Sequence, residues 1–268
     1  MIWIAIVLGI VEGLTEFLPI SSTGHLIVAG HVLGFTGPAA ETFEIVIQLG
    51  AILAVVWEYR RHLTQVVAGV LRPSPDPLSF ALARNLALAF LPAAAVGFLL
   101  HGVIRDYLFG PVTVAWALIV GGFAMLAVEA MQSKTEGGKV GSIMQITWGK
   151  ALAVGCAQVL SLFPGVSRAG ATIIGGMLSG LDRRTATEFS FYLAIPTMFA
   201  ATGYDLLKSW GSLSADMLIP FAIGFALAFL SALVAVRSFI RFISHHDFRP
   251  FAWYRIVFGV AVLAYFLI

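Results

Sequence analysis

The sequence predicts an all-α polytopic membrane protein that forms a single membrane domain over residues 1–268. Hydrophobic residues make up 59% of the 268 residues, charged residues make up only 11%, and the mean hydropathy is +0.94. A soluble domain averages roughly 45–50% apolar and 25% charged residues. The single cysteine, Cys156, excludes an intrachain disulfide and a cysteine-rich metal site.

Six segments are predicted to be transmembrane helices, because a span needs about 20 largely apolar residues. They cover residues 43–59, 83–102, 112–131, 187–206, 217–238 and 251–268. Two further apolar stretches, 2–35 and 147–182, are each interrupted midway by Pro, Gly and Ser. Each half is too short to cross a bilayer, so each stretch is predicted to form a re-entrant helical hairpin that lines a cavity.

The two interrupted stretches correspond to each other after a shift of 146 residues. The identities in register are Gly9–Gly155, Leu14–Leu160, Phe17–Phe163, Ser21–Ser167, Gly24–Gly170, Ile27–Ile173, Gly30–Gly176 and Gly34–Gly180. Three spans follow each hairpin, which predicts repeat 1 at about 1–131 and repeat 2 at about 147–268. Because three is odd, the topology of the second repeat would be inverted, a pattern known from transporters with a site at the repeat interface.

The distribution of Lys and Arg predicts which loops face the cytoplasm. If the first full span ends there, the cytoplasmic segments carry eleven basic residues, and the opposite loops carry only Arg105 and Lys208. The eleven are Arg60, Arg61, Arg72, Lys134, Lys139, Lys150, Arg183, Arg184, Arg237, Arg241 and Arg249. The first hairpin is therefore predicted to enter from outside and the second from the cytoplasm, with their tips meeting near mid-bilayer.

Charged side chains make the first hairpin a candidate functional site, since each charge in lipid costs roughly 3 kcal/mol on insertion scales. Glu12 and Glu16 are four residues apart and share one helix face. Unpaired they would repel each other, so we expect a divalent cation such as Mg²⁺ or Ca²⁺, or an Arg, to join them. The alternative is a structural pair in which one carboxylate is protonated or bonded to neighbouring helices.

Three hydroxyl residues, Ser21, Ser22 and Thr23, stand where the chain turns into the second helix of this hairpin. One of them is expected to cap that helix. The free N–H groups and positive dipole end of the same helix favour an anion. His25 follows Ser22 by three residues, close enough on one turn to act as a base on its hydroxyl.

In the second hairpin, Ser167 and Arg168 take the place of Ser21 and Ser22. Arg168 is interpreted as the one basic residue deep in an apolar region, and its guanidinium matches phosphate oxygens bidentately. Thr172, about one turn into the following helix, could add a hydroxyl. Two helix N-termini and an Arg predict a site for a multiply charged phosphate, because phosphoryl transfer needs mainly positioning and charge neutralisation.

Residues 12–25, EGLTEFLPISSTGH, and 164–170, PGVSRAG, resemble the two signature motifs of the bacterial undecaprenyl-diphosphate phosphatases of the bacitracin-resistance type. The resemblance covers essentially the whole chain. The second motif departs from it once, because family members usually carry Ser where this chain has Ala169. The Pro-Ser-Gly-His signature of the other membrane phosphatase superfamily is absent.

The resemblance implies hydrolysis of undecaprenyl diphosphate to undecaprenyl phosphate and inorganic phosphate. It places the reaction on the outer, periplasmic face of the bacterial cytoplasmic membrane, where it recycles the lipid carrier for cell-wall synthesis and confers bacitracin resistance. It also implies a divalent cation, a polyprenyl diphosphate lipid substrate, surrounding membrane lipid, no nucleic acid and a homodimer. The matching positions are Glu12, Glu16, Ser22, His25, Ser167, Arg168 and Thr172.

Together, the residues and the resemblance predict a phosphatase site. The predicted catalytic residues are Ser22, His25, Glu16 and Arg168; substrate binding is assigned to Ser21, Thr23, Ser167, Arg168 and Thr172, and metal binding to Glu12 and Glu16. Either Ser22 attacks the terminal phosphorus with help from His25, or His25 activates water directly. A transporter or flippase of the polyprenyl phosphate carrier is the alternative function, and hairpins that only hold helices together are a third.

Overall fold

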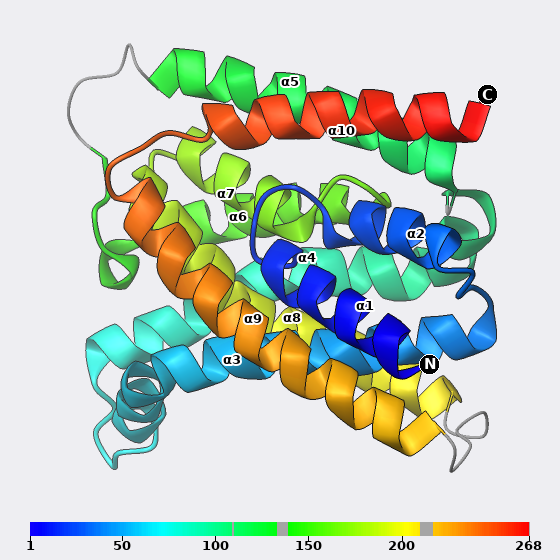
Figure 1. The fold of residues 1–268 in the computed structure, drawn as a ribbon. Coiled ribbons are helices and arrows are strands. Elements are labelled where there is room, and N and C mark those ends of the chain that lie inside the picture. The colour runs from blue at the N-terminus through cyan, green and yellow to red at the C-terminus, as the bar shows by residue number, and fades with distance from the viewer. Residues whose placement is uncertain (109, 133–138, 210–216, 268) are drawn as a thin grey trace.

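The computed structural model describes residues 1–108, 110–132, 139–209 and 217–267, without the side chains of residues 101, 103–108, 208 and 209. In this part of the chain nearly all residues are helical, and the only strand-like pairing is an isolated bridge between Val140 and Leu181 (Figure 1). Of the charges used to predict orientation, Lys134 and the side chains of Arg105 and Lys208 lie outside the described residues.

Six long helices match the six predicted spans, except at two end residues. They are α3 (Pro38–Val70), α4 (Pro77–Leu108), α5 (Pro111–Gln132), α8 (Arg183–Ser209), α9 (Leu218–Ile243) and α10 (Arg249–Leu267). Met217 precedes α9, and residue 268 lies outside the described residues. Within the described residues, all of these except α8 are long and apolar enough to cross a membrane, so the chain is a multi-pass membrane protein. Three of them begin at a proline, whose fixed φ suits the first helical position.

The two interrupted stretches form pairs of short helices separated by a break. The first pair is α1 (Ile2–Thr15) and α2 (Ser22–Val32), and the second is α6 (Trp148–Val159) and α7 (Arg168–Leu178). Two 3-10 turns, η1 (Ile143–Gln145) and η2 (Leu160–Leu162), precede α6 and the second break. Helices α2 and α7 each have 11 residues, and their starts and ends are both separated by the shift found in the sequence.

The backbone repeats the same special conformations at the two breaks. Ser21 and Ser167 have φ of 68° and 72°, and within the described residues they are the only non-glycine residues with positive φ. Such a conformation costs about 1–3 kcal/mol and persists only where the surroundings enforce it. Gly34 and Gly180, which follow α2 and α7, also have positive φ, as expected where a helix ends in a left-handed residue.

Each first half-helix packs closely on a helix from the other half of the chain, α1 on α9 and α6 on α4, while α5 and α10 lie side by side (Figure 1). At Gly9 a Cβ atom would lie 2.5 Å from the carbonyl oxygen of Gly224, and at Gly155 it would lie 2.5 Å from that of Ala89. No side chain fits at such a distance, so both glycines are required for the close crossing.

Helix α8 belongs to the interior, which explains why it is less apolar than the others. Its Phe189, Phe191 and Leu193 are fully buried in the main hydrophobic core. Phe17 of the first break meets Phe191 edge to face, with ring centroids 5.6 Å apart, and Ala169, at the start of α7 directly after the second break, joins the same core. The core therefore holds both breaks against one central helix.

Candidate active site

Glu16 connects the two breaks through its carboxylate. Its Oε1 accepts a hydrogen bond from Arg168 Nη2 at 3.1 Å, and its Oε2 accepts a hydrogen bond from the Ser22 hydroxyl. Glu16 and Ser22 are buried, and the Arg168 side chain is 11% exposed. Breaking a buried ion pair by removing one partner leaves an uncompensated charge, so this contact binds the two halves of the site firmly.

Arg168 is held on several sides. Its Nη1 donates to the backbone carbonyl of Ser190 at 3.3 Å, and its guanidinium carbon lies 5.4 Å from the centre of the Phe17 ring. Its Nε has no hydrogen-bond partner among the described residues. The Thr172 hydroxyl donates to the Arg168 carbonyl and shares a 2.7 Å hydrogen bond with the Ser190 hydroxyl. Thr172 thus links the backbone of Arg168 to Ser190, whose carbonyl accepts from the Arg168 side chain.

The two serines at the breaks differ in what their side chains do. Ser167 Oγ accepts a hydrogen bond from the Gly170 backbone N–H at 3.1 Å and so caps α7. Ser21, at the equivalent position before α2, makes no capping hydrogen bond with its side chain. The prediction that a hydroxyl of the first hairpin caps α2 is therefore wrong: the N-cap residue Ser21 makes no such bond, and the Ser22 hydroxyl donates to Glu16 instead.

His25 is anchored to α10. Its Nδ1 lies 2.7 Å from the Ser21 carbonyl oxygen and its Nε2 lies 2.6 Å from the Tyr254 hydroxyl. The imidazole stacks on the Phe258 ring at a centroid distance of 4.3 Å. Both ring nitrogens therefore have partners other than Ser22, and the structure gives the Ser22 hydroxyl a carboxylate partner where the sequence predicted an imidazole.

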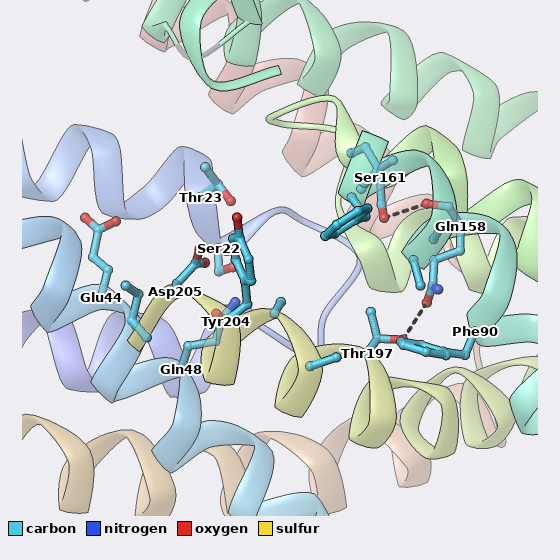
Figure 2. A pocket seen from close by; sticks show the side chains of 18 of the residues that line it. Ser22, Thr23, Glu44, Gln48, Phe90, Gln158, Ser161, Thr197, Tyr204 and Asp205 are labelled. Carbon is cyan, nitrogen blue, oxygen red and sulfur yellow. Dashed lines mark hydrogen bonds between the residues drawn. The ribbon is translucent and has the colours of Figure 1, made fainter. Parts of the chain in front are cut away.

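A cavity of about 830 Å³ opens beside this group (Figure 2). Glu12, Ser22 and Thr23 line one end of it, together with Glu44 and Gln48 of α3. Two other predicted residues do not line the cavity themselves: Glu16 is hydrogen-bonded to Ser22, and Arg168 is hydrogen-bonded to Glu16. Ser21, His25, Ser167 and Thr172 are not among the lining residues.

Glu12 is the most unusual residue of the cavity. Its side chain is 1% exposed, and neither carboxylate oxygen has a hydrogen-bond partner among the described residues. Glu16 and Glu44 are close enough to interact with it electrostatically, and both repel its negative charge. A buried, unpaired carboxylate is very costly unless a proton or a cation compensates it.

Much of the remaining lining of the cavity is apolar. It includes Phe90, Ala93 and Phe98 of α4 and Leu162 of η2. Ligand pockets typically combine such an apolar lining with a few convergent polar groups. A molecule with a charged head and a hydrocarbon chain therefore fits this cavity.

Sequence reasoning missed Arg255, which is 1% exposed and lies on α10. Its guanidinium donates to five backbone carbonyls, two on α5 and three in the breaks: Ala117, Leu118, Pro19, Gly165 and Val166. The interpretation of Arg168 as the one basic residue deep in an apolar region is therefore wrong. An Arg inside a predicted span is costly in lipid. The presence of Arg255 in the span 251–268 was therefore a sequence signal that its side chain has hydrogen-bond partners inside the protein.

The chain matches a known protein family over nearly its whole length. Residues 5–261 match the family described as bacitracin resistance protein BacA. The chain is 56% identical over 264 residues to a protein of Methylobacillus flagellatus named undecaprenyl-diphosphatase, covering 98% of this chain and 97% of the relative. It is 56% identical to the undecaprenyl-diphosphatase of Laribacter hongkongensis and 55% identical to undecaprenyl-diphosphatase 2 of Rhodospirillum rubrum, covering 97% of this chain and 93% of each relative.

Proposed function

The chain belongs to the bacitracin resistance protein BacA family, and on this premise we propose that it is an undecaprenyl-diphosphatase. The substrate would be undecaprenyl diphosphate, and the products undecaprenyl phosphate and inorganic phosphate. The observation that carries the proposal is the chain of contacts Ser22–Glu16–Arg168 at one end of a cavity that also has many apolar lining residues. In this arrangement Ser22 supplies a nucleophile, Glu16 a base and Arg168 a positive charge, next to a cavity with room for a lipid.

In the proposed reaction, Ser22 attacks the terminal phosphorus and Glu16 takes the proton of its hydroxyl. The bond between that phosphorus and the bridging oxygen breaks, and its electron pair leaves with undecaprenyl phosphate. Glu16 passes the hydroxyl proton to the departing undecaprenyl phosphate and is a carboxylate again. Water then attacks the phosphoserine while Glu16 takes a proton from it; the bond between phosphorus and the Ser22 oxygen breaks, and Glu16 returns the proton to that oxygen, which releases inorganic phosphate and restores Ser22. Glu16 replaces His25 as the base because its Oε2 already accepts the hydroxyl hydrogen bond.

Arg168 is proposed to hold the Glu16 carboxylate in place. Its hydrogen bond to Oε1 leaves Oε2 aimed at Ser22, so the two oxygens of Glu16 have separate tasks. The N-terminus of α2, where Ser22 and Thr23 line the cavity, adds backbone N–H groups and a positive dipole end.

A divalent cation, Mg²⁺ or Ca²⁺, fits the acidic end of the cavity. The unpartnered Glu12 carboxylate supports this, since hard cations take carboxylate oxygens. Both Glu16 oxygens already have partners, so Glu44 is proposed as the second carboxylate in place of Glu16. A cation bound there would neutralise the charge of the diphosphate.

We further propose that α1–α2 and α6–α7 are re-entrant hairpins and that α3–α5 and α8–α10 are six transmembrane helices in an inverted-topology repeat. The paired helix bounds, the two strained serines and the two close glycine crossings support this repeat. The loop charges support a site that opens on the periplasmic side of the bacterial cytoplasmic membrane. The homodimer stays a prediction from the family resemblance.

Release of inorganic phosphate by the purified protein tests the proposal. Undecaprenyl diphosphate in detergent should yield phosphate, a chelator should suppress it, and Ser22→Ala should abolish a trappable phosphoserine. A matched control is Ser244→Ala, at an exposed serine at the end of α9, which should leave turnover unchanged. Absence of phosphate release by the wild-type protein would refute the proposal. A transporter is not favoured, because the matched relatives are named as diphosphatases.

A further inference from the structure

Gln48 of α3 is a polar residue inside a predicted span, and the proposed reaction gives it no role. It lies on the face of α3 that lines the cavity, together with Glu41, Glu44 and Ile45 at helical spacing. Its side chain is half-buried, and among the described residues no hydrogen bond holds it to a neighbouring helix. A polar group at membrane depth needs a partner, so the partner of this amide is a molecule inside the cavity.

The packing of α1 and α3 on α9 places Gln48 beside Glu12. A Cβ atom at Gly9 of α1 would lie 2.5 Å from the Gly224 carbonyl oxygen, and a Cβ atom at Gly224 would lie 2.9 Å from the Ile47 side chain. Both helices therefore meet α9 at the same glycine. Gln48 follows Ile47 directly, and Glu12 stands about one turn after Gly9, so the two side chains lie at a similar depth.

Ser22 lies at this same end of the cavity. It lines the cavity with Glu12, Glu44 and Gln48, and Figure 2 shows the Gln48 side chain extending from α3 toward Ser22. Ionised carboxylates can only accept hydrogen bonds, whereas a neutral amide both donates and accepts. Gln48 therefore offers an uncharged group that can hold a water molecule without repelling a phosphate.

The two nucleophiles of the proposed reaction differ in how they are held. Ser22 is part of the first turn of α2, and its hydroxyl already donates to Glu16. The water of the second step has no covalent attachment, and it must approach the phosphoserine from the open side of the cavity. Holding a reactant in the right geometry can supply several kcal/mol of the barrier, so a free water gains most from a group that orients it.

We propose that Gln48 holds the water that attacks the phosphoserine, so that it acts in the second chemical step and not in the first. This inference rests on the proposed function. Gln48 Oε1 accepts a hydrogen bond from one O–H of the water, and the other O–H gives its proton to Glu16. The water oxygen bonds to phosphorus as the bond between phosphorus and the Ser22 oxygen breaks. Gln48 itself neither gains nor loses a proton.

Rapid-quench kinetics on undecaprenyl diphosphate labelled in its terminal phosphate test this role. Gln48→Met keeps the length of the side chain and removes the amide. Phosphoserine should form at the wild-type rate, but its hydrolysis should slow by about 10–100-fold because the water is no longer held in place. Phosphoserine should therefore accumulate, and kcat and KM should fall by the same factor. The ratio kcat/KM should stay unchanged, because it depends only on the steps up to the formation of phosphoserine.

Gln65→Met is the matched control. It makes the same change on the same helix, at a residue that does not line this cavity, and it should leave both steps unchanged. The melting temperature of Gln48→Met should equal or exceed that of wild type, because no hydrogen bond within the protein is lost. A marked fall in melting temperature would show that the amide is bonded inside the protein and would overturn the proposal.

Three kinetic results in a folded Gln48→Met protein would also overturn it. One is hydrolysis of phosphoserine at the wild-type rate. Another is a fall in kcat/KM, which would place Gln48 in substrate binding or in the first step. The third is a rise in the concentration of Mg²⁺ or Ca²⁺ needed for half-maximal activity, which would place the amide on the cation.

The proposed function and the role of Gln48 fail in different ways. If the wild-type protein releases no phosphate, the proposed function is wrong. If it releases phosphate without forming phosphoserine, attack by Ser22 is wrong and the role of Gln48 fails with it. If phosphoserine forms and is hydrolysed equally fast in wild type and Gln48→Met, only the role of Gln48 is wrong.

Discussion

Glu16 Oε1 and Arg168 Nη2 lie 3.1 Å apart although 152 residues separate them in the chain. The contact joins the end of α1 to the start of α7, so each hairpin supplies one partner of a buried ion pair. The hydroxyl of Ser22 completes the group on the other carboxylate oxygen. Activity therefore depends on the relative position of two breaks and not on either hairpin alone.

Replacing Glu16 tests its proposed role as base. Glu16→Gln removes the proton acceptor of Ser22 and leaves Arg168 without its carboxylate, so kcat should fall by about 10²–10⁴. Stability should fall by about 3–5 kcal/mol, because a buried charge loses its partner. Phosphate release and thermal unfolding in detergent measure the two effects. Glu188→Gln, which breaks the more exposed pair with Arg184, should change kcat little.

The anchoring of His25 predicts a coupled pair. His25→Gln and Tyr254→Phe each disturb one hydrogen bond between α2 and α10, so their effects on kcat should be smaller than that of Glu16→Gln and should not add in the double variant. A double-mutant cycle on turnover measures this coupling. Should His25→Gln alone lose as much activity as Glu16→Gln at unchanged stability, His25 would be the base after all.

The carbonyls that accept from Arg255 predict that replacing this residue causes a large loss of stability. Arg255→Met leaves several buried carbonyls without a donor, each costing about 1–3 kcal/mol, so the protein should lose at least ~3 kcal/mol. Arg255→Lys should recover part of that loss because it keeps the charge. Arg249→Ala, in the exposed pair with Asp247, should change stability by no more than about 1 kcal/mol. Equal melting temperatures for Arg255→Met and Arg249→Ala would contradict this account.

The glycine crossings predict an effect of a single methyl group. Gly9→Ala and Gly155→Ala should each destabilise the protein by about 1–3 kcal/mol, because the methyl would meet a backbone carbonyl that cannot move aside. Gly149→Ala is the control in α6, since no atom lies within 4 Å of its added Cβ. It should be neutral or slightly stabilising. Thermal unfolding of the three variants gives the comparison.

Asp76 at the start of α4 predicts a pH-dependent contribution to stability. Hydrogen bonds from Ser79, including one from its backbone N–H at 2.8 Å, hold the pKa of Asp76 below its ordinary value. A lowered folded-state pKa gives stability that is present above the unfolded-state pKa and is lost as pH falls through the folded-state pKa. The melting temperatures of wild type and Asp76→Asn should therefore differ at neutral pH and converge in acid. A constant difference at all pH values would contradict it.

The sequence predicted the helical class, the regions of the six long helices and both breaks, because composition and Pro-Gly-Ser interruptions are local signals. It brought together Ser22, Glu16 and Arg168 as site residues, but it did not predict their partners. The partner of His25 comes from α10, at Tyr254, and such a contact has no local signature.

The dependence of both breaks on Arg255 has a consequence for biogenesis. The carbonyls of Pro19, Gly165 and Val166 receive their donor from the last helix of the chain. During synthesis those carbonyls lack the Arg255 donor until residues 249–267 have left the ribosome and entered the membrane. The two breaks can therefore reach their final hydrogen bonding only after the last helix has been made, and we expect a chain that ends before this helix to be inactive.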